Sequence, residues 1–161
     1  MSATDYLYVY AEMSAILVGF SAVVVTFRKA EDRSDFSSYT LSNVIQRGLA
    51  TALFATLPGL LSHVDQLTEH VWRLSSLAFF TFGIISVLNS FRWFRSVKSE
   101  ELPFSSVRYY ILSGTGLSFS LLTGFNIWAG IPWIYMVNIT WLFISTGFLV
   151  LTYIGTLRTD A

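Results

Sequence analysis

The stretch AEMSAILVGFSAVVVTF, residues 11–27, has the composition of a membrane-spanning helix, yet it contains the carboxylate of Glu12. A helix needs about 20 apolar residues to cross the hydrocarbon core of a bilayer. A carboxylate that leaves water costs several kcal/mol unless it is paired, hydrated or protonated. The stretch therefore predicts a membrane protein and marks Glu12 as the first candidate functional residue.

The composition extends this prediction to the whole chain. Of its 161 residues, 53% are hydrophobic and only 12% are charged, whereas about a quarter of the residues in a soluble domain are charged. The absence of cysteine excludes disulfides, thiolate metal sites and cysteine nucleophiles. A formal net charge of zero argues against nucleic-acid binding, which requires a basic surface. We expect an all-α integral membrane protein in which residues 1–161 form a single polytopic domain.

Five stretches are long and apolar enough to be transmembrane helices, near residues 6–27, 44–64, 72–91, 107–128 and 132–156. In the second stretch, Asn43 has the position of an N-cap, and Pro58-Gly59 predicts a bend or a local unwinding. Thr68 is the expected cap of the third helix, and Pro132 suits the first turn of the fifth. The first apolar run lacks a basic leader and is expected to be retained as a span.

Lysine and arginine are enriched in short cytoplasmic loops, so their distribution predicts the orientation. With five spans and an outer N-terminus, nine basic residues fall on the cytoplasmic side: Arg28, Lys29, Arg33, Arg47, Arg92, Arg95, Lys98, Arg108 and Arg158. Only Arg73 falls outside, together with the acids Asp5, Glu12, Asp65 and Glu69, which gives that side a net formal charge of minus three. We expect an outer N-terminus, a cytoplasmic C-terminus and a plasma or bacterial inner membrane.

Two interpretations of the helix face around Glu12 remain open. In the first, several copies assemble with the first helix innermost, and Glu12 forms a ring of carboxylates near the outer mouth of a pore. The residues that would line this path are Glu12, Ile16, Gly19, Val23 and Thr26. In the second, the small residues of the face let another helix approach closely, and Glu12 is protonated or hydrogen-bonded. A polar cluster in the outer half of the bundle would then include Asn126, Asn138 and His63.

A second pattern of small residues lies in the fourth predicted span. Gly116, Ser120 and Gly124 recur every fourth residue and therefore share one side of a helix. Small residues at this spacing are typical of a close contact between two membrane helices. We expect this side to pack against another helix, and a substrate-binding role is the less favoured alternative.

The predicted outer loop brings four potential metal ligands close together in sequence: His63, Asp65, Glu69 and His70. Imidazole and carboxylate groups are suitable ligands for zinc or manganese. Their spacing matches no specific metal motif, and a short exposed loop is often simply polar. A metal site and a simply polar loop are therefore the two interpretations of this segment.

The sequence contains no nucleotide-binding glycine loop, HExxH zinc motif or nucleophile elbow, so we expect neither an enzyme nor a bound cofactor. The favoured hypothesis is a homo-oligomeric channel or permeation protein for cations, embedded in the lipid bilayer with Glu12 near its outer mouth. One alternative is a non-catalytic membrane subunit that binds or regulates a partner protein. Another is a small-solute carrier with a site near Glu12, Asn126 and Asn138.

Overall fold

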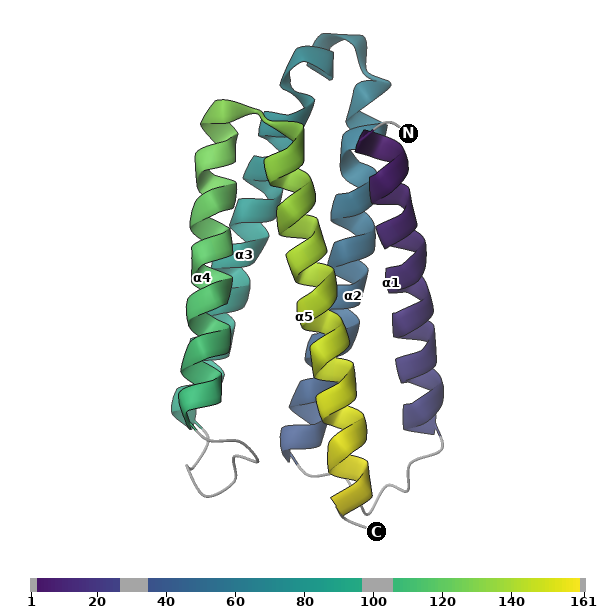
Figure 1. The fold of residues 1–161 in the computed structure, drawn as a ribbon, viewed down its shortest axis with the longest axis vertical. Coiled ribbons are helices and arrows are strands. Elements are labelled where there is room, and N and C mark those ends of the chain that lie inside the picture. Colours follow the sequence, from purple (N-terminus) through teal and green to yellow (C-terminus); the bar gives the residue numbers. More distant parts are fainter. Residues whose placement is uncertain (1–2, 27–34, 97–105, 160–161) are drawn as a thin grey trace. The chain divides into compact units, whose positions relative to one another are not determined.

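The structure, a computed structural model, describes residues 3–26, 35–96 and 106–159, and within them the side chains of residues 3–23, 41–92, 95 and 114–151. These residues form five α-helices and one 3-10 helix, in the order α1 (Ala3–Thr26), α2 (Asp35–Ser62), η2 (Asp65–His70), α3 (Val71–Ser96), α4 (Ser106–Ala129) and α5 (Pro132–Thr159) (Figure 1). The predicted all-α fold is confirmed.

Four stretches of the described helices are long and apolar enough to cross a membrane: Ala3–Val23, Leu41–Ser62, Asp65–Arg92 and Pro132–Leu151. A helix of about 20 residues spans the hydrocarbon core of a bilayer. The backbone polar groups of such a helix are satisfied within the helix itself, which is what lipid requires. The chain is thus a multi-pass helical membrane protein.

The predicted start of the fifth helix is confirmed, whereas two predicted helix caps are wrong. α5 begins at Pro132, as predicted. Proline suits this position because the N–H group that it lacks would have no partner in the first turn of a helix. By contrast, α2 begins at Asp35, so the N-cap predicted at Asn43 is wrong: that residue lies inside the helix. Thr68 does not cap α3 either. Its hydroxyl donates to the carbonyls of Val64 and Asp65 within the 3-10 helix η2.

Pro58 lies inside α2, which continues without a break to Ser62, so the predicted local unwinding does not occur. Proline cannot donate the helical hydrogen bond to the carbonyl four residues earlier. Membrane helices tolerate this loss when neighbouring groups pack around the freed backbone. Here the Tyr8 side chain packs directly on Gly59, where a Cβ atom would overlap the tyrosine hydroxyl.

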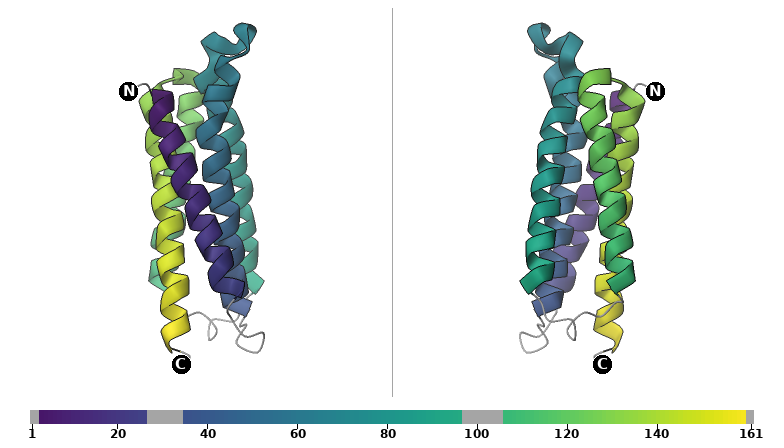
Figure 2. Two further views of the ribbon diagram at one scale, coloured as in Figure 1. Left: turned by 90° about the vertical axis from the view of Figure 1, so that its right-hand side faces the viewer. Right: turned by 90° about the vertical axis from the view of Figure 1, so that its left-hand side faces the viewer.

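The chain divides into two compact units, one formed by Met1–Leu60 with Ile139–Ala161 and the other by Leu61–Asn138. In the first unit α1 and α2 run antiparallel, side by side in both views of Figure 2. Tyr8 near the start of α1 contacts Gly59 near the end of α2, and Val18 contacts Gly48. Glycine at these two positions permits the close approach of the helices.

In the same unit, α5 is attached to both of the other helices by polar and aromatic contacts. The Thr140 hydroxyl donates to the Tyr10 hydroxyl at 3.0 Å, and the rings of Tyr10 and Phe143 lie 5.6 Å apart. The Arg47 guanidinium of α2 donates to the Ser145 hydroxyl at 3.4 Å. These contacts define which side of α5 faces α1 and α2.

The second unit is built on an antiparallel pair, α3 and α4. Along the pair, Arg73 lies beside Gly130, Ser76 beside Asn126, Phe80 beside Gly124 and Gly83 beside Ser120. From Arg73 to Gly83 and from Gly130 back to Ser120 the chain covers about ten residues each, so one register holds along the pair. The first residues of α5 complete the unit, since the Tyr135 ring contacts Trp72 and Phe79 of α3 at centroid distances of 5.9 and 6.1 Å.

Many of the buried side chains are small hydroxyls rather than large apolar groups. Several of them donate to a carbonyl of their own helix, among them Ser21 to Leu17 at 2.7 Å and Thr51 to Arg47 at 2.8 Å. Small residues of this kind are typical of contacts between membrane helices, where lipid supplies no hydrophobic driving force for association. Close backbone approach therefore contributes much of the packing.

Candidate functional site

The helix α1 is held in its unit by a narrow line of buried residues. Leu7, Ser14 and Ser21 are buried, and they recur every seventh residue, so they lie almost above one another along the helix. Tyr10 and Val18, which flank this line, make the contacts to α5 and α2. The remaining circumference of α1 is largely exposed.

The opposite side of α1 carries the residues that the sequence predicted to line a path. Glu12, Ile16, Gly19 and Val23 are all exposed, Ile16 by 70% and Val23 by 53%. At 3.6 residues per turn they lie about 180° from the buried line. Nothing lies within 4 Å of the position of a Cβ atom at Gly19. Thr26 belongs to α1, but its side chain lies outside the described residues.

The position of Glu12 along α1 is also unusual. It follows the first residue of the helix by nine positions, roughly 13 Å along the axis. Among the described side chains, no other exposed charge lies so far from both ends of its helix. Arg47 lies as deep in α2, but it is half-buried. The carboxylate therefore lies in an apolar span and is not covered by the described residues of its own unit.

Asn126 belongs to the predicted polar cluster, and its hydrogen bonds stabilise the turn between α4 and α5. Its side-chain amide donates to Ser76 Oγ at 2.9 Å, and its Oδ1 accepts from the backbone N–H of Ile131 at 2.8 Å. Its backbone carbonyl accepts from the N–H of Gly130, which has a φ of +63°. Glycine adopts this left-handed conformation readily at the end of a helix. Asn126 is fully engaged within the protein.

The other two members of the predicted cluster differ from each other. Asn138 is buried, and its amide donates to the carbonyl of Ile134 at 2.8 Å, while its Oδ1 has no hydrogen-bond partner among the described residues. His63 is exposed between α2 and η2. Asn138 is therefore the member that keeps a buried acceptor available.

The three small residues predicted for the packing side of α4 differ in their surroundings. Ser120 and Gly124 lie against α3: a Cβ atom at Gly124 would stand 3.1 Å from the Phe80 ring, and one at Gly83 would stand 3.0 Å from Ser120 Oγ. A Cβ atom at Gly116 would meet nothing within 4 Å. The close contact with α3 is thus formed by the later half of the pattern.

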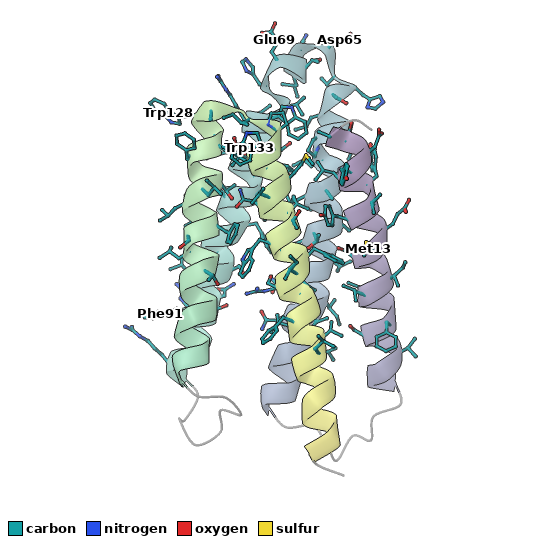
Figure 3. All side chains as sticks on the ribbon, viewed as in Figure 1. Met13, Asp65, Glu69, Phe91, Trp128 and Trp133 are labelled. Carbon is teal, nitrogen blue, oxygen red and sulfur yellow. The ribbon has the colours of Figure 1, made fainter. Side chains whose placement is uncertain are left out.

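The four potential metal ligands of the predicted outer loop are all exposed: His63, Asp65, Glu69 and His70. Figure 3 labels Asp65 and Glu69 on η2. In the part of the chain that the structure describes, no three histidine, cysteine, aspartate or glutamate side chains come together as a metal site. The structure does not assemble these four residues into a ligand set.

Arg47, which the sequence placed among the cytoplasmic charges, also lies inside the helix bundle. The residue lies twelve positions after the start of α2, and its guanidinium reaches Ser145 of α5. An arginine within an apolar span normally faces the bundle interior. The sequence signal for this position was a single arginine in an apolar stretch, with Gly48 next to it and Thr51 one turn later.

The contacts described here define one face of α1 as the candidate site, in a multi-pass helical membrane protein whose apolar helices contact lipid. The site consists of a single carboxylate and an exposed strip of small and branched apolar residues. No protein-family model, curated protein or solved structure matches this chain.

Proposed function

We propose that copies of this chain assemble around α1 and form a cation-conducting path through the membrane, with Glu12 near its outer mouth. The observation that carries the proposal is the position of Glu12 on the side of α1 opposite the buried line Leu7, Ser14 and Ser21. In this proposal the protein is not an enzyme and needs no cofactor.

The physical argument concerns the cost of an uncovered carboxylate. An ionised group facing lipid costs at least about 2.5 kcal/mol near the bilayer centre. Assembly of several chains through this face would remove Glu12 from lipid and place it in water. A ring of carboxylates then attracts cations, and the rings formed by Ile16 and Val23 make a narrow apolar stretch of the kind that gates by dewetting. Gly19, with open space around it, would let the helices approach.

The proposed topology has five crossings, an outer N-terminus and a cytoplasmic C-terminus, in a plasma or bacterial inner membrane. α4 contains 24 residues, about 36 Å of helix, and it lies antiparallel beside α3, which supports a crossing by both. The distribution of basic residues supports the orientation. Six of the nine cytoplasmic basic side chains lie outside the described residues: Arg28, Lys29, Arg33, Lys98, Arg108 and Arg158.

The second candidate is a non-catalytic subunit whose exposed α1 face binds a helix of a different membrane protein. The same exposure of Ile16, Gly19 and Val23 supports it, because a partner helix would cover Glu12 as well as a second copy would. The two candidates differ in what surrounds α1, so the copy number and the identity of the neighbours separate them.

The first experiment tests conduction. The purified chain is reconstituted in liposomes, and the permeability ratio of K⁺ to Cl⁻ is measured for the wild type, Glu12→Gln and Glu69→Gln. Glu69 is an exposed carboxylate on η2, so its substitution makes the same chemical change away from α1. We expect the ratio to fall towards one only for Glu12→Gln. An unchanged ratio in an assembled Glu12→Gln protein would overturn the proposal.

The second experiment tests which face forms the contact. Since the chain has no cysteine, Gly19→Cys and Gly114→Cys each introduce a single thiol at an exposed glycine with nothing within 4 Å. We expect oxidation in the membrane to cross-link copies through position 19 and not through position 114. Cross-linking at position 19 to another protein, with a single copy of this chain, would support the partner-binding candidate instead.

A further inference from the structure

The turn between α4 and α5 carries the two most exposed tryptophans among the described side chains. Trp128, one residue before the end of α4, is 85% exposed, and Trp133, the second residue of α5, is 61% exposed. Figure 3 labels both at the end of their helices that the turn joins. Tryptophan prefers the boundary between lipid headgroups and acyl chains, where its ring is in lipid and its N–H in water.

Arg73 reaches the same turn from α3. It is the third residue of α3, and a Cβ atom at Gly130 would stand 3.1 Å from its Cγ and 3.2 Å from its Nε. The arginine side chain thus lies along the backbone of the turn, in the space that the glycine leaves open. Since Arg73 faces Gly130 in the register of the α3–α4 pair, its charge and the two tryptophans lie at one level along the helices.

The charge of Arg73 is exposed and makes no hydrogen bond or ion pair with any residue in the described ranges. Glu69 precedes it by four positions and is also exposed, but the two do not form an ion pair. A guanidinium presents a planar fork of N–H groups that matches the oxygens of a phosphate. A guanidinium that a turn holds beside two exposed tryptophans is suited to binding an anion at the level of the lipid headgroups.

We propose that this turn binds the phosphate of a membrane phospholipid, with Arg73 donating to the phosphate oxygens and with Trp128 and Trp133 inserted beside its glycerol region. The ligand is a lipid phosphate rather than free phosphate, because the exposed tryptophan rings need the acyl boundary that only a lipid provides. The site lies entirely within the unit Leu61–Asn138. It does not depend on conduction or on Glu12.

The test uses the full chain in nanodiscs that contain a phospholipid with a spin label on its headgroup. The quenching of Trp128 emission is obtained as the difference between the wild type and Trp128→Phe. We expect Arg73→Gln to reduce this quenching severalfold and Arg73→Lys to reduce it less. Arg92→Gln, which removes an exposed arginine from the other end of α3, should leave it unchanged.

Two additional measurements keep the result unambiguous. Gly130→Ala adds a Cβ atom 3.1 Å from the Cγ of Arg73 and also strains the left-handed backbone of the turn, so it should reduce the quenching with the arginine still present. Far-ultraviolet circular dichroism establishes that each variant is folded. Quenching that is equal in the wild type and folded Arg73→Gln would overturn the proposal. The quenching should persist when inorganic phosphate is added at the concentration of the lipid phosphate, and its loss at that concentration would also overturn the proposal, because the tryptophans would then give the lipid no advantage over a free anion.

Discussion

The side-chain amide of Asn126 donates to Ser76 Oγ at 2.9 Å, and the same side chain accepts from the backbone N–H of Ile131. One residue of α4 therefore joins α3 to the turn that precedes α5. Asn126 and Ser76 are both fully buried, so neither group has water as an alternative partner. The loss of one partner leaves the other with an uncompensated polar atom.

Asn126→Ala should lower the free energy of unfolding by about 2–4 kcal/mol, because it leaves the Ser76 hydroxyl and the Ile131 N–H without their partner. The measurement is unfolding in mixed micelles with increasing dodecyl sulfate, followed by helical circular dichroism. Asn89→Ala is the control, since Asn89 is an exposed asparagine on α3. Equal effects of the two substitutions would contradict the role of Asn126 in the turn.

Ser14 and Ser21 provide a matched pair on the buried line of α1. The Ser14 hydroxyl is buried without a hydrogen-bond partner among the described residues, whereas the Ser21 hydroxyl donates to the carbonyl of Leu17 at 2.7 Å. We expect Ser14→Ala to be neutral or to stabilise the protein by up to about 1 kcal/mol, since it removes an unpaired polar group. Ser21→Ala should cost about 0.5–1.5 kcal/mol, since it removes a hydrogen bond that is formed. The same unfolding assay measures both, and a larger loss for Ser14→Ala would refute the assignment.

Gly48→Ala and Gly114→Ala should change stability in opposite directions. Alanine is favoured over glycine in a helix by about 1 kcal/mol, and at Gly114 the added methyl group meets nothing within 4 Å. At Gly48 it overlaps the Val18 side chain of α1. Overpacking of this kind typically costs about 1–3 kcal/mol. Gly48→Ala should therefore unfold at a lower dodecyl sulfate fraction than Gly114→Ala, and the reverse order would contradict the α1–α2 contact.

The hydrogen bond from Thr140 to Tyr10 can be isolated by a double-mutant cycle with Tyr10→Phe and Thr140→Val. We expect a coupling energy of about 0.6 kcal/mol, which is the average for such bonds in membrane bundles. Tyr6→Phe is the control for Tyr10→Phe, because Tyr6 is an exposed tyrosine of the same helix. A cycle of Tyr6→Phe with Thr140→Val should give no coupling. Absence of coupling in both cycles would show that the bond adds nothing to stability.

Some features of the fold could be predicted from local sequence. The helical class and the start of α5 at Pro132 follow from apolar length and from the missing N–H of proline. The start of α2 could not be predicted in this way. Most of the residues from Asp35 to Asn43 are polar, and no apolar pattern distinguishes such an extension from a loop. Of the two outcomes predicted from Pro58, a bend or a local unwinding, the unwinding does not occur. That alternative considered only the lost hydrogen bond, whereas the Tyr8 contact at Gly59 depends on a distant part of the chain.

The sequence by itself determined that this is a helical membrane protein with a carboxylate, Glu12, in its first apolar stretch, because length and hydropathy are properties of one segment. Only the tertiary structure decided that α1 is buried along Leu7, Ser14 and Ser21, so that Glu12 lies on the exposed side, and that Asn126 serves the α4–α5 turn. The physical reason is that lipid is as apolar as a helix interface. In a membrane protein both sides of a helix are therefore apolar, and periodicity alone cannot distinguish the side that contacts protein.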